Sequence, residues 1–361
     1  MVLRKIYSPL LRDHPNTRNA TYSRALAALF VMSIHYGGFG LREVGKNNIF
    51  INQLLNNLID FGSQGPVIFF VSSGFVLQLT YGSMLKNRKS LIFKIFIYRW
   101  FRLAPMYLLV TLFAYKFVYT GNQSLSLSLL IKKSFFLDGF FKDAYLFQPI
   151  FIGEWIVAEF WLTIILLVPT IFLGSKKIKK NILYLLLFTS FFANYLTLKC
   201  KSGSINIVIC EFTKNNTIIE NFIINQFYFL LGSLLIQLKP QSKLFRRVNL
   251  LTNIFLSFGI LFINSYRGYY ALFWAITFLY SENNKLLRKN WIQQYLLLPI
   301  GNSCYSIYLI HYPLMEYLIK NNILNEHIYI ALIVIFFSFI GFMIVEVPFN
   351  KLGRRTFKNT K

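Results

Sequence analysis

Long apolar runs alternate with short polar and basic segments along almost the whole chain. A helix needs about 20 predominantly apolar residues to cross the hydrocarbon core of a bilayer, and runs near this length recur throughout the sequence. The pattern predicts an all-α fold, a polytopic membrane bundle of about ten transmembrane helices. The expected helices cover residues 24–40, 64–82, 103–120, 151–173, 182–198, 218–238, 250–264, 267–281, 294–318 and 328–347.

The charges between these runs predict how the bundle is oriented. Lys and Arg are roughly twice as frequent in the segments of one side as in those of the other, as is typical of cytoplasmic loops. The N-terminal tail and the tail from Lys351 to Lys361 both fall on the richer side. We therefore expect both termini in the cytoplasm, with residues 348–361 forming a basic cytoplasmic tail.

Composition supports the membrane class and narrows the range of partners. The chain is 55% hydrophobic and 14% charged, whereas soluble domains contain about 25% charged residues. The net charge of +25 is divided among short clusters instead of forming one patch, so no nucleic-acid partner is expected. Three cysteines do not make a disulfide framework, although pairing of Cys200 with Cys210 in one outer segment stays open.

Arg24 and His35 are two polar residues within the first apolar run. Eleven residues of helix separate them by about 16 Å, roughly half of a hydrocarbon core. Ionisable side chains in membrane helices usually face a packed interior or a water-filled space, which makes both residues functional candidates. The alternative is a snorkelling arginine and a histidine that serves helix packing.

Two further ionisable residues are expected at a depth similar to that of His35. In the predicted topology Glu159 and His311 each lie about two turns from the outer ends of their helices, so one polar site would hold all three. A carboxylate beside a histidine suits general base catalysis, because it orients the ring and stabilises the imidazolium. The alternatives are a packing hydrogen bond for Glu159 and a bond to a backbone carbonyl for His311.

Arg99 and Arg102 form a second group on the cytoplasmic side. They are three residues apart, hence on one helix face, and guanidinium groups suit phosphate oxygens. Together with Arg24 they predict a positively charged binding site for a phosphorylated ligand on the cytoplasmic side. Contact with lipid head groups is the alternative for arginines at a helix end.

A series of motifs makes the chain similar to a known family. In chain order they are Arg24 to His35 with ten residues between them, Phe69-Phe70 before Ser73-Gly74-Phe75, Arg99 to Arg102 with Pro105 and Tyr107, Glu159-Phe160-Trp161, Tyr305 and Tyr308 before His311 and Pro313, and Glu346-Val347-Pro348. They resemble acyltransferase family 3, integral membrane proteins that include bacterial O-acetyltransferases of lipopolysaccharide, capsule, exopolysaccharide and peptidoglycan. The match spans nearly the whole chain, so we expect residues 1–361 to form a single domain.

The resemblance implies transfer of an acyl group, most often acetyl from acetyl-CoA, to a sugar hydroxyl of a glycan or glycolipid at the bacterial inner membrane. It implies that His35 is the base, oriented by Glu159, with a covalent acyl-histidine as the alternative route. Arg24, Arg99 and Arg102 are expected to bind the donor. Ser73, Tyr107, Tyr305 and His311 are expected to line the pocket, although Ser73 beside a glycine also suits helix packing. Acetyl-CoA and membrane lipid are the expected partners, without a metal or a bound cofactor.

The chain departs from the family pattern at two positions. Thr21 stands where the family often has an acidic residue three positions before the arginine. The segment between Trp155 and Glu159 is one residue shorter than usual, which rotates Trp155 by about 100° relative to the helix face that bears Glu159.

Two other functions fit the same pattern of helices. A transporter or flippase also has many helices with polar groups at mid-depth, but the sequence shows neither an inverted repeat nor paired Gly/Pro-broken helices. A catalytically silent relative that binds glycolipid is the other alternative.

Overall fold

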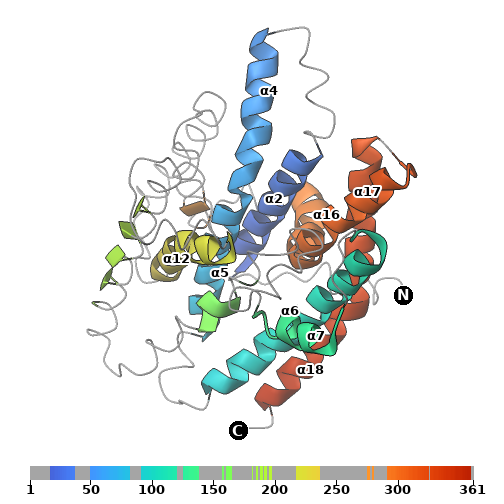
Figure 1. Ribbon diagram of the computed structural model, residues 1–361. Coiled ribbons are helices and arrows are strands. Elements are labelled where there is room, and N and C mark those ends of the chain that lie inside the picture. The colour runs from blue at the N-terminus through green and yellow to red at the C-terminus, as the bar shows by residue number, and fades with distance from the viewer. Residues whose placement is uncertain are drawn as a thin grey trace. The chain divides into compact units, whose positions relative to one another are not determined.

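The computed structural model describes the parts of the chain that carry most of these motifs. The described residues are 17–36, 49–81, 91–119, 125–137, 157, 160–164, 181, 184–185, 188–189, 191–192, 195–196, 217–235, 275–276, 279, 291–324 and 326–358. All regular structure within these ranges is helical (Figure 1). The predicted all-α class is therefore confirmed for the described part of the chain.

The chain divides into two compact units, each described by itself. Unit 1 comprises Met1–Ser72 and Leu238–Val347, and unit 2 comprises Ser73–Gln237 and Pro348–Lys361.

Unit 1 is built around the first helix, α2. Its elements are α2 (Arg18–His35), α4 (Ile49–Phe61), η2 (Gly62–Gln64), the first part of α5 (Gly65–Tyr81), η5 (Gln293–Leu297), α15 (Leu298–Asn302), α16 (Cys304–Lys320), α17 (His327–Gly341) and η6 (Phe342–Glu346). Helix α2 packs against η2, α15 and α16, and its position beside α16 is visible in Figure 1. Gly301 permits the close approach of α15, because a Cβ there would lie 2.2 Å from the carbonyl oxygen of Thr21.

Unit 2 contains the long helix α6 and the helices that pack on it. Its elements are the rest of α5, α6 (Leu91–Phe117), α7 (Leu127–Ser134), α12 (Thr217–Leu235) and α18 (Val347–Lys358). Helix α7 folds back along α6: the Leu125 amide donates to the Tyr115 hydroxyl at 3.3 Å, and the Trp100 indole donates to the Ser134 carbonyl oxygen at 2.8 Å. The segment 125–137 therefore returns toward the middle of α6.

Phe136 lies at the end of this returning segment and is fully buried. Its ring centroid is 4.6 Å from that of Phe160 and 5.2 Å from that of Tyr107, and its carbonyl oxygen accepts a 2.8 Å bond from the Trp161 indole. Its backbone has a φ of 57°, which is unfavourable for a bulky residue. Phe136 is therefore a core residue of unit 2.

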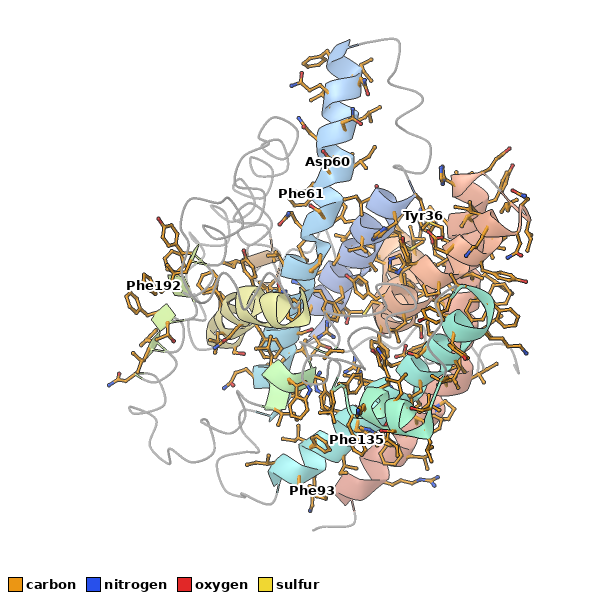
Figure 2. The ribbon with its side chains drawn as sticks, viewed as in Figure 1. Tyr36, Asp60, Phe61, Phe93, Phe135 and Phe192 are labelled. Atoms are coloured by element: carbon orange, nitrogen blue, oxygen red, sulfur yellow. The ribbon has the colours of Figure 1, made fainter. Side chains whose placement is uncertain are left out.

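We predict that replacing Phe136 by alanine lowers the stability of the detergent-solubilised protein by about 3–5 kcal/mol, as is typical for a buried phenylalanine. Phe135 is the control, since it is the preceding residue and its side chain is 41% exposed (Figure 2). Thermal unfolding followed by tryptophan fluorescence measures both variants. Equal melting temperatures would contradict the buried position of Phe136.

The observed helices correct several expected boundaries. The first helix runs over Arg18–His35 and not 24–40, and it ends just before the Gly37-Gly38 pair of the sequence. The third begins at Leu91 and not at 103, and it continues through Pro105 to Phe117. Helix α4 was not expected, because its asparagines keep this amphipathic stretch below the hydropathy of a membrane span.

Two helices among the described residues are long and apolar enough to cross a membrane, Ile92–Phe117 and His327–Arg355. The expected helix 250–264 lies outside the described residues, as do most of 151–173, 182–198 and 267–281. The count of ten helices and the cytoplasmic termini therefore stay predictions.

Candidate active site

Arg24 and His35 lie on one uninterrupted helix, α2, so the axial separation of about 16 Å holds. Arg24 is six residues inside this helix and is buried, with its Cζ 5.7 Å from the centroid of the Phe69 ring on α5. The ring of Phe69 packs edge-on against Tyr308 of α16, with centroids 5.0 Å apart. The guanidinium thus lies over an aromatic face, which is a favourable place for a cation. The expected helix began at Arg24, whereas the observed helix begins six residues earlier, at Arg18.

The structure brings His35 together with His311. His35 is the last residue of α2, its side chain is exposed, and its ring centroid lies 5.2 Å from that of His311 on α16. The ring of Tyr312 meets His35 edge-on, also at 5.2 Å. Two histidines that the sequence places on helices far apart in the chain therefore form one site. Two imidazolium ions this close would repel each other, which favours states with at most one added proton on the pair.

The hydrogen bonds of His311 define its tautomer. Its Nδ1 lies 2.9 Å from the Tyr308 carbonyl oxygen and 3.1 Å from that of Ile307. A carbonyl oxygen only accepts, so Nδ1 carries the proton and Nε2 is the acceptor. His311 is only 6% exposed, and its Nε2 has no hydrogen-bond partner among the described residues. The backbone bond expected as the alternative for His311 is thus present, and it leaves the second nitrogen available for chemistry.

Three residues around this pair were not found from the sequence. Tyr36 is fully buried, and its hydroxyl donates to the His311 carbonyl oxygen at 3.0 Å where the end of α2 approaches α16 (Figure 2). Tyr312 donates a hydrogen bond to the carboxylate of Glu316. The spacing of four residues between Tyr312 and Glu316 is a usable signal for a helical pair, whereas nothing in the sequence singles out Tyr36.

A hydrogen bond between Ser306 and Glu346 connects the motif on α16 with the Glu346-Val347-Pro348 motif. The buried Ser306 hydroxyl donates to the buried carboxylate of Glu346, which lies in the π-helical turn η6. A buried carboxylate needs such donors, and π-helical turns often accompany functional sites. Tyr305, one residue earlier on α16, is also buried.

Arg99, Arg102, Tyr107 and Ser73 belong to unit 2. Arg99 is buried and Arg102 half-buried on α6, and Tyr107 is a core residue beside Phe136. The binding site expected to be formed jointly by Arg24, Arg99 and Arg102 stays a prediction, because Arg24 belongs to unit 1 and the other two arginines belong to unit 2.

Ser73 is fully buried in α5 beside Gly74, whose carbonyl oxygen accepts a 3.1 Å bond from Ser233 of α12. A Cβ on Gly74 would lie 2.0 Å from the Phe229 carbonyl oxygen. The Ser-Gly step therefore serves the packing of α5 on α12, which was the alternative expected for it.

Glu159, the expected partner of His35, lies outside the described residues, as do Trp155, Cys200 and Cys210. Cys304 is a buried free cysteine on α16. Within the described ranges no three His, Cys, Asp or Glu residues gather in a way that could hold a metal ion.

Fold and site together define a helical protein with membrane-length apolar helices and a two-histidine polar site. The chain belongs to the acyltransferase 3 family, since the family model described as Acyltransferase domain matches residues 19–349. This range contains every site residue named above, and acyl transfer is the activity that the membership indicates. No curated protein and no solved structure matches the chain.

Proposed function

We propose that the chain is a multi-pass membrane O-acyltransferase. It moves an acyl group, most simply acetyl from acetyl-CoA, to a hydroxyl of a cell-surface polysaccharide or its lipid-linked precursor. Family membership supports acyl transfer, and the two span-length helices support a membrane location. The bacterial inner membrane, ten helices and cytoplasmic termini are part of the same proposal, and the distribution of Lys and Arg supports them.

The observation that carries the mechanism is the pairing of an exposed His35 with the buried acceptor nitrogen of His311. In the proposed reaction the acceptor hydroxyl oxygen attacks the thioester carbonyl carbon. The new C–O bond forms, the C–S bond breaks, and His35 takes the hydroxyl proton and returns it to the leaving thiolate. His311 then stabilises the imidazolium by accepting a hydrogen bond at Nε2.

The supporting residues have separate roles in this proposal. Tyr312, held by Glu316, packs against the His35 ring and limits its orientation. Glu159 is proposed as a second orienting group. Arg24, Arg99 and Arg102 are proposed to bind the phosphates of the donor, which suit the planar fork of guanidinium.

Deletion of the gene tests the proposed function. We expect the O-acetyl content of the surface polysaccharide to fall to background, because no other step of the proposed route would supply the ester. Proton NMR of the purified polysaccharide measures the acetyl signal, and a complemented deletion strain is the control. Unchanged acetylation together with altered export of the polysaccharide would overturn the enzyme proposal in favour of a transporter.

A further inference from the structure

Helix α16 continues past the end of α2. Gly301, which precedes α16, approaches Thr21 near the start of α2. At the other end the Tyr36 hydroxyl donates to the His311 carbonyl oxygen. The two segments therefore run side by side in the same direction, and residues 312–320 extend α16 by about two and a half turns beyond this junction. In the proposed topology this is the outer end of α16, the side on which a surface glycan is found.

Tyr312 and His35 form a corner at the start of this extension. Their ring centroids are 5.2 Å apart, and the two ring planes are inclined by 76°. The side chain of His35 is exposed and that of Tyr312 is half-buried, so part of each is open to a ligand. Because the planes are nearly perpendicular, a flat ligand that lies on the Tyr312 ring presents its edge to His35.

Glu316 adds a carboxylate about one turn further along the same face of α16. Four residues separate it from Tyr312, whose hydroxyl donates to the carboxylate. An ionised carboxylate has about four acceptor positions, so the bond from Tyr312 leaves others for the hydroxyl groups of a ligand. Glu316 is half-buried, and a carboxylate that faced lipid would be unfavourable. This face of α16 therefore suits a polar ligand.

We propose that Tyr312 and Glu316 form an acceptor subsite, which binds one pyranose unit of the glycan beside His35. The inference rests on the proposed function and names the residues that hold its acceptor. A pyranose has faces of C–H groups, which pack on an aromatic ring, and a rim of hydroxyl groups, which donate to a carboxylate. A sugar that lies on Tyr312 directs its rim toward His35, where the reacting hydroxyl loses its proton. An apolar ligand is disfavoured, because Glu316 would lose its hydration without gaining a donor.

The test measures how the full-length protein in nanodiscs binds the polysaccharide purified from the deletion strain, which carries free acceptor hydroxyls. Tyr312→Ala removes the ring and Glu316→Gln removes the charge, and each is expected to weaken binding about tenfold. Tyr312→Phe keeps the ring and is expected to bind within about threefold of the wild type. Glu316→Gln preserves the size of the side chain, so it carries the test if the alanine variant misfolds.

Tyr329→Ala and Glu326→Gln are the matched controls. Both residues are exposed near the start of α17, and none of the contacts that define the site involves them. Each control is expected to change the affinity for the polysaccharide by less than about twofold.

Weaker binding in Tyr312→Ala and Glu316→Gln, with unchanged binding in the controls, supports the subsite. Unchanged binding in both variants overturns it, even where Tyr312→Ala slows transfer, because the ring would then only position His35. In that case a wild type that binds the polysaccharide and acetylates it leaves the proposed function intact. A wild type that does not bind the polysaccharide contradicts the proposed acceptor itself.

Discussion

Replacing His35 by alanine is expected to reduce acyl transfer by about 10²–10⁴-fold, the usual contribution of a positioned general base. In a deletion strain that expresses the variant, the polysaccharide should carry no more acetyl than in the deletion strain itself. The reason is that His35 is the exposed ring beside the acceptor nitrogen of His311. His35 is exposed at the end of α2, so its removal leaves no cavity in the core.

His327 provides the matched control for His35. It is an exposed histidine at the first position of α17, and none of the contacts that define the site involves it. His327→Ala should support normal acetylation at equal protein abundance in the membrane. If His35→Ala acetylates as well as His327→Ala, His35 is not the base.

Changing His311 is expected to produce the second large effect, and the choice of substitute separates its two nitrogens. Asparagine keeps an amide donor near the Ile307 and Tyr308 carbonyl oxygens but has no counterpart of Nε2. We expect His311→Asn to lose about 10²-fold in transfer rate while its melting temperature stays close to that of the wild type. Glutamine places an oxygen near the former Nε2 and should recover part of the rate.

The dependence of rate on pH gives a further readout for His311. If Nε2 stabilises the imidazolium of His35, His311→Asn should shift the acidic limb of the pH profile, whereas a purely structural role would lower the amount of folded protein without moving that limb. Full activity of His311→Asn would show that the acceptor nitrogen has no part in the reaction.

The part of the fold that could be predicted from the sequence is the part fixed by local hydropathy. The apolar runs located α2, α5, α12, α16 and α17, because burial of apolar surface governs where such helices form. Their ends shifted by several residues. In α2 the helix begins before the apolar run, because polar residues such as Ser23 continue the helix when tertiary contacts bury them. Helix α4 and the return of α7 along α6 depend on packing and have weak local signals.

The candidate site was likewise predictable from the sequence only in part. Common depth on two expected helices was enough to suggest that His35 and His311 share a site, and the structure places their rings together. The hydroxyl of Tyr36 and the Ser306–Glu346 hydrogen bond depend on which helix faces meet, which no local pattern specifies.

The most direct test of the central claim is the release of free coenzyme A thiol from acetyl-CoA by the purified protein in vesicles, with and without the polysaccharide acceptor. The account predicts release by the wild type that depends on the acceptor, with one acetyl ester formed for each thiol, and none above background for His35→Ala. Equal release by the two proteins, or no release by a wild type that binds acetyl-CoA and acceptor, would contradict it.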